Sequence, residues 1–186
     1  MKNIFIPILL GTSRIGNTSE HVAQFIFEEV KKLNKFETEL IKVSDFVSSP
    51  KTESSMTKDA HEIWHNTMIK ADGLIIVSPE YNHGYPGELK LMLDELYKEY
   101  NFKPLGIVGV SSGAFGGARG IEALRHVASE LKMVSLRNML YFPTAQKILE
   151  TNNQAYKDGY KAKFDEFFNE LLWYAETLKS KRPVNN

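Results

Sequence analysis

The sequence predicts an α/β fold of three layers, in which a doubly wound, five-stranded parallel sheet lies between helices. Short apolar runs alternate along the chain with segments whose apolar residues recur at the period of a helix. Most of these runs are apolar at every position, which is typical of parallel strands that helices cover on both faces. We expect the strand order 2-1-3-4-5, which is common among sheets of this size.

The first half of the chain supplies two strands, two helices and a polar loop. The apolar run Ile4–Leu10 predicts a buried strand, and Ser19–Leu33 carries an apolar face at helical spacing. Thr38–Val43 alternates between apolar and polar residues, which indicates a strand nearer the edge of the sheet. Ser44–Met56 is rich in Ser, Thr, Lys and Pro and predicts a mobile loop. Lys58–Ala71 has the pattern of the second helix.

The second half continues the same alternation. Gly73–Ser78 predicts the third strand, and Pro86–Tyr100 predicts a helix because proline sits in its first turn and an apolar stripe follows. The remaining predicted elements are the strands Leu105–Val110 and Val134–Leu140 and the helices Gly117–Lys132 and Ala155–Lys181. A chain of 186 residues is long enough for one apolar core, so residues 1–186 are expected to form a single domain.

The composition limits the classes of partner. Basic and acidic residues balance at 23 each, and a zero formal charge argues against nucleic acid as the main partner. The chain has no cysteine, which excludes disulfides, thiolate nucleophiles and zinc–thiolate sites. The first apolar run is too short to span a membrane. We expect a cytoplasmic protein that does not associate with membranes.

Three polar loops that contain glycine follow the first, third and fourth predicted strands. They are Gly11–Ser19, Pro79–Gly87 and Ser111–Gly117. In the order 2-1-3-4-5 these three strands are neighbours, and ligands of such sheets bind outside the carboxyl ends of the strands at the switch point. The three loops are therefore expected to meet in one site, and their residues suit a phosphorylated planar cofactor.

The first loop has the composition of a phosphate cradle. Gly11 permits a sharp turn, and Arg14 supplies a bidentate donor. Backbone N–H groups at the start of the following helix favour an anion. Alternatively, the hydroxyl side chains only cap that helix. The predicted phosphate-binding residues are Thr12, Ser13, Arg14, Asn17, Thr18 and Ser19.

A dinucleotide site is a second interpretation of the first loop. Gly11, Ser13 and Gly16 fit the spacing G-x-G-x-x-G with the middle glycine replaced, and Asp45 is a candidate for the ribose-binding acid. However, the Ser13 side chain would obstruct a pyrophosphate where the motif has glycine. Several hydroxyl and amide donors suit a terminal phosphate better.

The second and third loops have the features of a site for a flat ring. The predicted contacts in the second loop are Pro79, Glu80, Tyr81, Asn82 and His83, with Gly84 allowing an unusual turn that presents main-chain N–H groups. Such donors stabilise negative charge on a reduced flavin. The predicted contacts in the third loop are the small residues Ser111, Ser112 and Gly113. Alternatively, the histidine and tyrosines serve only the surface and packing, and the third loop is only a flexible turn.

The most specific resemblance to a known family lies in the second loop. Residues 79–82 read Pro-Glu-Tyr-Asn, and Pro-Gly-Glu-Leu-Lys at 86–90 is followed by Asp94. This resembles the PEYN…PGxLKNxLD motif of the NADPH-dependent FMN reductases, which include azo-, quinone- and chromate-reducing enzymes. Leu91 replaces the asparagine of the motif. The resemblance runs from about residue 3 to residue 145.

The first loop resembles the G-S-x-R-x-x-S-x-N segment of the same family. Thr12 stands for the first serine, Asn17 for the second and Ser19 for the asparagine, and each keeps a side chain that can form hydrogen bonds. Ser111-Ser112-Gly113 with Gly116-Gly117 matches the small-residue loop of the family after its fourth strand.

The resemblance implies a flavodoxin-like fold and bound FMN. The phosphate would lie on Thr12–Ser19 and the ring edge against Pro79–His83, with Ser111–Gly113 beside the ring. It also implies a homodimer or a homotetramer. The tyrosines at 85, 97 and 100 would serve an interface between copies, unless they are half-buried core residues.

The resemblance also implies a ping-pong reaction. NADPH or NADH would pass a hydride to N5 of FMN, and a small-molecule electron acceptor would then take the electrons: a quinone, an azo compound, free flavin or a metal oxyanion. FMN carries this chemistry, so no side chain is required as an acid or a base. One competing hypothesis is a flavodoxin-like electron carrier, although such carriers are usually strongly acidic. Another is a dinucleotide-dependent dehydrogenase that uses Asp45.

Overall fold

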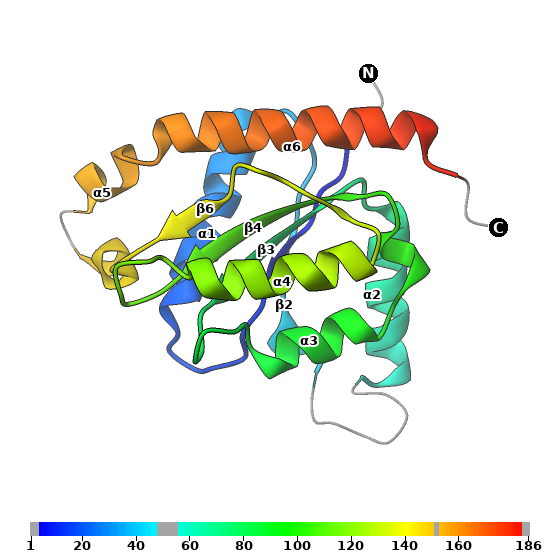
Figure 1. Cartoon of the computed structure of the whole chain (residues 1–186), viewed down its shortest axis with the longest axis horizontal. Helices are drawn as coiled ribbons and strands as arrows, with labels where there is room; N and C mark the ends of the chain where they lie inside the picture. Colours follow the sequence, from blue (N-terminus) through cyan, green and yellow to red (C-terminus); the bar gives the residue numbers. More distant parts are fainter. Residues whose placement is uncertain (1–3, 48–55, 151–152, 184–186) are drawn as a thin grey trace.

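A computed structural model describes residues 4–47, 56–150 and 153–183, and Figure 1 shows a parallel sheet with helices around it. The strands are β1 (Ile8–Leu10), β2 (Leu40–Lys42), β3 (Leu74–Pro79), β4 (Pro104–Val110), β5 (Val134–Ser135) and β6 (Leu140–Phe142). The order β2-β1-β3-β4-β5 confirms the predicted topology, and every pairing of these strands is parallel. The carboxyl ends of β1, β3 and β4 therefore lie side by side.

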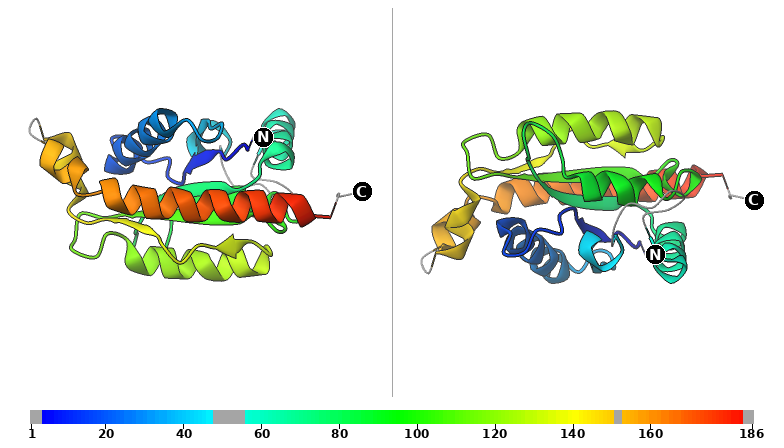
Figure 2. Two further views of the ribbon diagram at one scale, coloured as in Figure 1. Left: turned by 90° about the horizontal axis from the view of Figure 1, so that it is seen from above. Right: turned by 90° about the horizontal axis from the view of Figure 1, so that it is seen from below.

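Helices cover both faces of this sheet. They are α1 (Thr18–Leu33), α2 (Lys58–Lys70), α3 (Gly87–Asp94), α4 (Ala118–Glu130), α5 (Gln154–Asp158) and α6 (Lys161–Lys181), with 3-10 helices η1 (Val43–Asp45), η2 (Lys98–Tyr100) and η3 (Ala145–Leu149). Figure 2 shows α1 and α4 on opposite sides of the sheet. α1 packs against α6 through Phe25 and Phe164, whose ring centroids are 5.3 Å apart.

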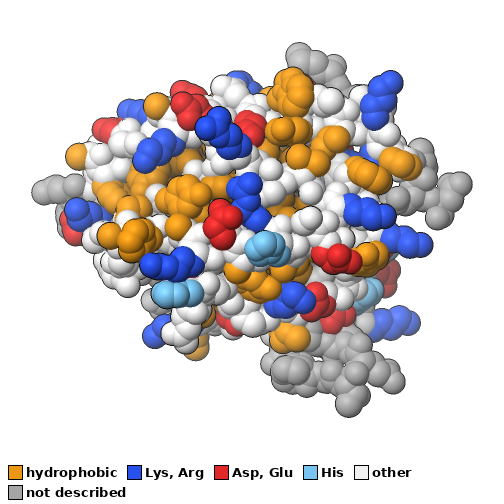
Figure 3. Space-filling view, in the orientation of Figure 1, with side chains coloured by type: hydrophobic (Ala, Val, Ile, Leu, Met, Phe, Trp, Pro, Cys, Tyr) orange, Lys and Arg blue, Asp and Glu red, His pale blue; other side chains and the backbone are white. Residues whose placement is uncertain are grey.

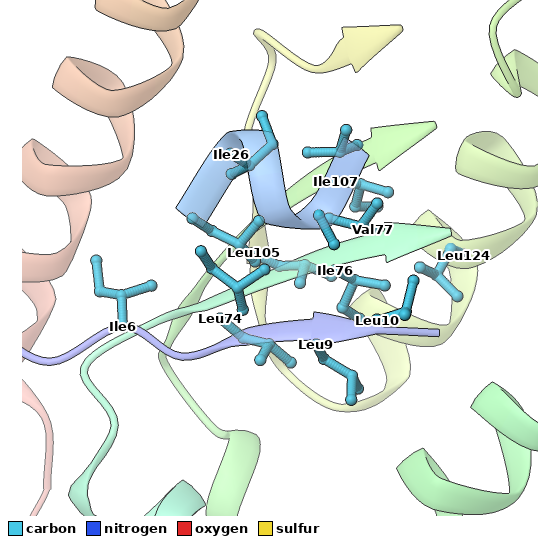
Figure 4. Packing of buried hydrophobic residues seen from close by; sticks show 14 of the residues in the cluster. Ile6, Leu9, Leu10, Ile26, Leu74, Ile76, Val77, Leu105, Ile107 and Leu124 are labelled. Atoms are coloured by element: carbon cyan, nitrogen blue, oxygen red, sulfur yellow. The ribbon is translucent and has the colours of Figure 1, made fainter. Parts of the chain in front are cut away.

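The core consists of side chains from the strands and the inner faces of the helices (Figure 4). β3 and β4 are buried at every position, whereas β2 shows the alternation that its sequence predicts. α6 crosses β4 at Gly106, because a Cβ there would lie 2.4 Å from Cζ of Phe167. The aromatic ring thus occupies a notch that only glycine leaves open.

The predicted fifth strand, Val134–Leu140, is divided in two. β5 pairs with the beginning of β4 and β6 with its end. Between them the N–H groups of Arg137 and Asn138 donate to the carboxylate of Glu170 on α6, at 3.0 and 3.1 Å. The prediction of one continuous strand was wrong because this carboxylate takes the place of a neighbouring strand.

Two predicted helices are shorter than expected. The helix predicted over Pro86–Tyr100 ends at Asp94, and Tyr100 is fully buried in η2, where its hydroxyl accepts a 3.1 Å hydrogen bond from Trp64. Tyr100 is therefore a core residue rather than an interface residue. The helix predicted over Ala155–Lys181 is interrupted by a turn at Gly159. Of the predicted loop Ser44–Met56, residues 48–55 lie outside the described residues.

Charged groups fix the carboxyl end of α6 to the segment that leads into β3, at the amino ends of the strands. The buried carboxylate of Asp72 accepts from Lys179 at 2.7 Å, and Arg182 donates to the carbonyls of Ala71 and Asp72. Nearby, the buried ammonium of Lys103 donates to the carbonyl of Met68. Within the described part of the chain, no helix has the length and apolarity that a membrane span requires.

Candidate functional site

A pocket of about 410 Å³ lies at the carboxyl ends of β1, β3 and β4. It is lined by Arg14, Ile15, Gly16, Asn17, Thr18, Ser19, Pro79, Glu80, Tyr81, Val110, Ser111, Ser112, Ala145 and Gln146. All three predicted loops therefore meet in one place, as the topology requires. A larger groove of about 610 Å³ lies along α1 and α5, away from these strand ends, and its charged side chains pair with one another.

The part of the first loop that faces the pocket is Arg14–Ser19. Asn17 caps α1, because its side-chain oxygen accepts from the N–H of Glu20 at 2.8 Å and its amide donates to the carbonyl of Arg14 at 2.7 Å. The residue that caps α1 is thus Asn17 rather than one of the hydroxyl side chains to which the alternative interpretation assigned this role. The N–H groups of Thr18 and Ser19, in the first turn, have no acceptor within the helix. They and Arg14 are the donors available to an anion in the pocket.

Thr12 and Ser13 are not pocket-lining residues. Their hydroxyl groups and the N–H of Ser13 donate to one carboxylate oxygen, Oε1 of Glu88 on α3, at 2.9 to 3.2 Å. Gly11 packs closely on α3, because a Cβ there would lie 2.8 Å from the end of the Leu89 side chain.

Glu88 was not predicted as a site residue, and in sequence it is simply a charged residue at the start of a helix. Burial favours its neutral form, but the hydrogen bonds from the first loop and from its own backbone outweigh burial and lower the pKa of the Glu88 carboxyl. The side chain is therefore an anion in neutral solution and accepts hydrogen bonds only.

The second loop forms a tight turn whose unusual backbone lies at Asn82 and His83. Their φ angles are +50° and +66°, and Tyr81 and Gly84 exchange two backbone hydrogen bonds of 2.9 Å. Two successive positive φ angles are the signature of a type I′ turn. The prediction that Gly84 makes the unusual turn was wrong. The N–H groups of Asn82 and His83 form no hydrogen bond with any residue that the structure describes, whereas that of Tyr81 is used within the turn.

Glu80 lines the pocket, but its carboxylate is engaged elsewhere. Oε2 accepts from the N–H groups of Arg119 and Gly120, at 3.0 and 3.3 Å, at the start of α4. The Arg119 guanidinium lies 3.6 Å from Oε1 and also covers the exposed ring of Phe115. These contacts make Glu80 the capping group of α4.

The third loop is attached to a segment that the sequence did not mark as functional. The N–H groups of Thr144 and Ala145 donate to the carbonyls of Gly113 and Ser111 at 3.1 and 3.0 Å, which brings Ala145 and Gln146 to the pocket wall. A Cβ on Gly113 would meet no atom within 4 Å. Ser111 and Ser112 line the pocket, whereas Gly113 is not part of its wall.

Asp45, the candidate ribose-binding acid, lies in η1 and is not part of the pocket wall. Its carboxylate accepts from the hydroxyl of Ser44 at 3.2 Å. The dinucleotide interpretation therefore loses the acidic residue on which it depends. Among the residues that the structure describes, no group of three or more His, Cys, Asp or Glu side chains could hold a metal ion.

Comparison with known proteins agrees with this geometry. Residues 5–147 match the sequence model of the family described as NADPH-dependent FMN reductase. The chain belongs to the NADPH-dependent FMN reductase family. It is an oxidoreductase that uses FMN and NAD(P)H.

Three curated relatives of this FMN reductase are 28% to 35% identical to it over the matched segments. An NAD(P)H-dependent FMN reductase of Schizosaccharomyces pombe is 35% identical over 136 residues, which cover 69% of this chain and 67% of the relative. A 2-hydroxy-1,4-benzoquinone reductase of a Burkholderia species is 30% identical over 118 residues, covering 60% and 63%. An FMN-dependent NADPH-azoreductase of Staphylococcus aureus is 28% identical over 127 residues, covering 64% and 65%.

Solved structures resemble this FMN reductase in fold. FerB, a flavoenzyme NAD(P)H:(acceptor) oxidoreductase from Paracoccus denitrificans, superposes with a TM-score of 0.71 at 16% identity and covers 92% of this chain and 98% of its own. The apo form of the NADH:FMN oxidoreductase EMOB superposes with a TM-score of 0.68 at 20% identity, covering 89% and 88%. These structures support the flavodoxin-like fold.

Proposed function

We propose that this FMN reductase transfers electrons by a ping-pong sequence from NADPH or NADH, through FMN held in the pocket of the three loops, to a quinone, an azo compound, free flavin or a similar small acceptor. The observation that carries the proposal is that the pocket joins the cationic and N–H donors of the first loop to Tyr81 of the second. The turn at Asn82 and His83, with its two unused N–H groups, follows Tyr81 directly but is not part of the pocket wall.

The first loop fits the phosphate of FMN. Arg14 is exposed at the pocket and offers a planar fork of donors, and the first turn of α1 adds the N–H groups of Thr18 and Ser19. Asn17 caps α1 with a neutral amide, and the carboxylate in the first turn, that of Glu20, is paired with Lys42. The partial positive charge of this helix end therefore favours an anion in the pocket.

The second and third loops fit the ring of FMN. The positive φ angles of Asn82 and His83 hold their N–H groups in a fixed turn, and Gly113 leaves its backbone uncovered. Bound FMN supplies the chemistry of accepting and releasing a hydride. The part of these residues is to orient the ring and to place N–H dipoles where negative charge would be favoured. Glu80, engaged at α4, has no role as an acid or a base in this proposal.

An absorption experiment tests the function. The purified full chain is reconstituted with FMN, and the flavin band is followed anaerobically after addition of NADPH or NADH. We expect the band to bleach with at least one nucleotide and to return when a quinone or an azo dye is added. A flavin that binds but is not reduced by either nucleotide would rule out the reductase and favour an electron carrier.

Arg14→Ala tests the phosphate end. We expect the dissociation constant of FMN to rise by about tenfold to a hundredfold, because a charge-assisted hydrogen bond contributes roughly 1.5–3 kcal/mol. The melting temperature of the FMN-free protein should stay unchanged, since Arg14 is exposed. The measurement is titration of flavin fluorescence, with riboflavin as the matched ligand that lacks a phosphate. Equal loss of affinity for FMN and riboflavin would contradict the assignment.

We also propose that the chain forms a homodimer through the face formed by α3 and α4. A homotetramer would contain two such dimers. A mainly apolar groove of about 480 Å³ lies between these helices and contains Leu96, Tyr97, Val127 and Leu131. The Tyr97 side chain is 50% exposed there, and Figure 3 shows hydrophobic side chains among charged ones on the face formed by α3 and α4. Sedimentation equilibrium of Tyr97→Glu against the unmodified chain would show a shift toward monomer if this groove is the interface.

A further inference from the structure

The carboxylate of Glu88 connects α3 to the first loop of the candidate cofactor site. One oxygen, Oε1, accepts from the Ser13 N–H at 2.9 Å, the Ser13 hydroxyl at 3.2 Å and the Thr12 hydroxyl at 3.2 Å. The carboxylate is partly buried, and its bonds join residues that are 75 and 76 positions apart in sequence. These three hydrogen bonds to one carboxylate oxygen hold Thr12 and Ser13 in place within a polar loop.

α3 itself is held firmly, so that Glu88 ties the loop to a rigid element. The next residue, Leu89, is fully buried and packs directly on Gly11 at the end of β1. The loop is thus attached to α3 at two successive positions, by packing at Gly11 and by hydrogen bonds at Thr12 and Ser13.

The hydrogen bonds extend from Glu88 into the second loop. The hydroxyl of Thr12 has one proton, which it donates to the ionised Glu88. The Tyr81 hydroxyl, 3.1 Å from Thr12, must therefore donate to it, and so must the N–H of Arg14 at 3.3 Å. This ordered chain of donors fixes Tyr81 and the backbone of Arg14, both of which line the pocket.

We infer that Glu88 is a positioning residue of the cofactor site, which holds the first loop and Tyr81 in their ligand-binding arrangement before FMN enters. The inference rests on the proposed FMN site. It adds Glu88, which does not line the pocket. Holding a loop in its bound conformation raises affinity because less conformational entropy is lost on binding. Without the carboxylate, the N–H of Ser13 and two hydroxyl groups lose their acceptor, and the loop gains alternative conformations.

The test compares Glu88→Ala and Glu88→Gln with Glu62→Ala, which removes an exposed glutamate on α2 far from the three loops. FMN affinity is measured by fluorescence titration, and hydrogen exchange of the Ser13 amide is measured in the FMN-free full chain. We expect Glu88→Ala to raise the dissociation constant by about tenfold and to abolish protection of the Ser13 amide. Glu88→Gln keeps an acceptor oxygen and should restore most of both properties. Glu62→Ala should change neither.

The two measurements separate this inference from the proposed function. If Glu88→Ala keeps both the affinity for FMN and the protection of Ser13, Glu88 is not a positioning residue, although the FMN site stands. If the unmodified chain does not bind FMN, the proposed function fails. Unprotected Ser13 in that same FMN-free chain would then overturn the arrangement at Glu88 as well. Should Glu88→Ala fail to fold, Glu88→Gln decides, because a neutral amide is a weaker acceptor than a carboxylate. Weaker protection of the Ser13 amide together with about threefold weaker FMN binding would support the inference. Unchanged values of both would overturn it.

Discussion

Gly117→Ala is expected to lower the free energy of unfolding by about 3 kcal/mol. Gly117 has φ of +83° at the start of α4, a conformation that costs alanine roughly 1–2 kcal/mol. In addition, its Cβ would lie 2.7 Å from the backbone nitrogen of Val110 and 3.0 Å from Cα of Gly109. These contacts are with the main chain of β4, which cannot move aside as a flexible side chain can.

Urea denaturation measures this effect, and Gly87→Ala is the matched control. Gly87 is the first residue of α3, and a Cβ there meets nothing within 4 Å. Its replacement should leave stability unchanged or raise it by about 0.5–1 kcal/mol, because alanine favours helices and restricts the unfolded chain. Equal stability of the Gly117 and Gly87 variants would show that α4 does not approach β4 as closely as described.

The stability of the protein is expected to rise between pH 7 and pH 10, because of Lys103. Burial, and to a smaller extent the nearby Arg182, lowers the pKa of its ammonium from 10.5 to about 7, against the opposing effect of Asp72 and Glu99. Below pH 7 Lys103 is protonated in both the folded and the unfolded chain, so the folded state bears the full free-energy cost of burying the charged ammonium. Between the two pKa values only the unfolded chain holds it, so stability increases with pH.

The size of this increase follows from linkage. A pKa difference of this size contributes on the order of 4 kcal/mol over the interval. The measurement is the free energy of unfolding at pH 7, 8, 9 and 10 for the unmodified chain and for Lys103→Met. The variant lacks the titrating group, so the difference between the two proteins isolates Lys103 from other groups that titrate in alkaline solution. Parallel curves would contradict the prediction.

Most of the fold was predictable because each strand carries a local signal. The continuous apolar runs of β3 and β4 reflect burial on both faces, and the alternation in β2 reflects its place at the edge. The errors came from contacts between distant residues. Nothing in residues 134–140 shows that Glu170 will interrupt the strand, and the end of α3 depends on the burial of Tyr100 against Trp64.

The site was predictable to the extent that topology decides it. Loops that follow neighbouring parallel strands must meet, and Arg14, Ser19 and Ser111 do line one pocket. The direction of individual side chains was not predictable. Thr12 and Ser13 are residue types that commonly bind phosphate, yet here they donate hydrogen bonds to Glu88. The segment at Thr144–Gln146 carries no motif. Its place at the pocket follows from backbone hydrogen bonds to the third loop, which only the structure shows.

Two helices, α1 and α4, begin beside the pocket, and groups of different charge cap their amino ends. The start of α4 holds the carboxylate of Glu80, whereas α1 is capped by the neutral amide of Asn17, and the Glu20 carboxylate in its first turn is paired with Lys42. A molecule with one anionic end therefore meets Arg14 and free N–H groups at the start of α1, whereas the N–H groups of Arg119 and Gly120 at the start of α4 already bind Glu80. This difference between the two helix ends would determine the orientation in which such a molecule binds.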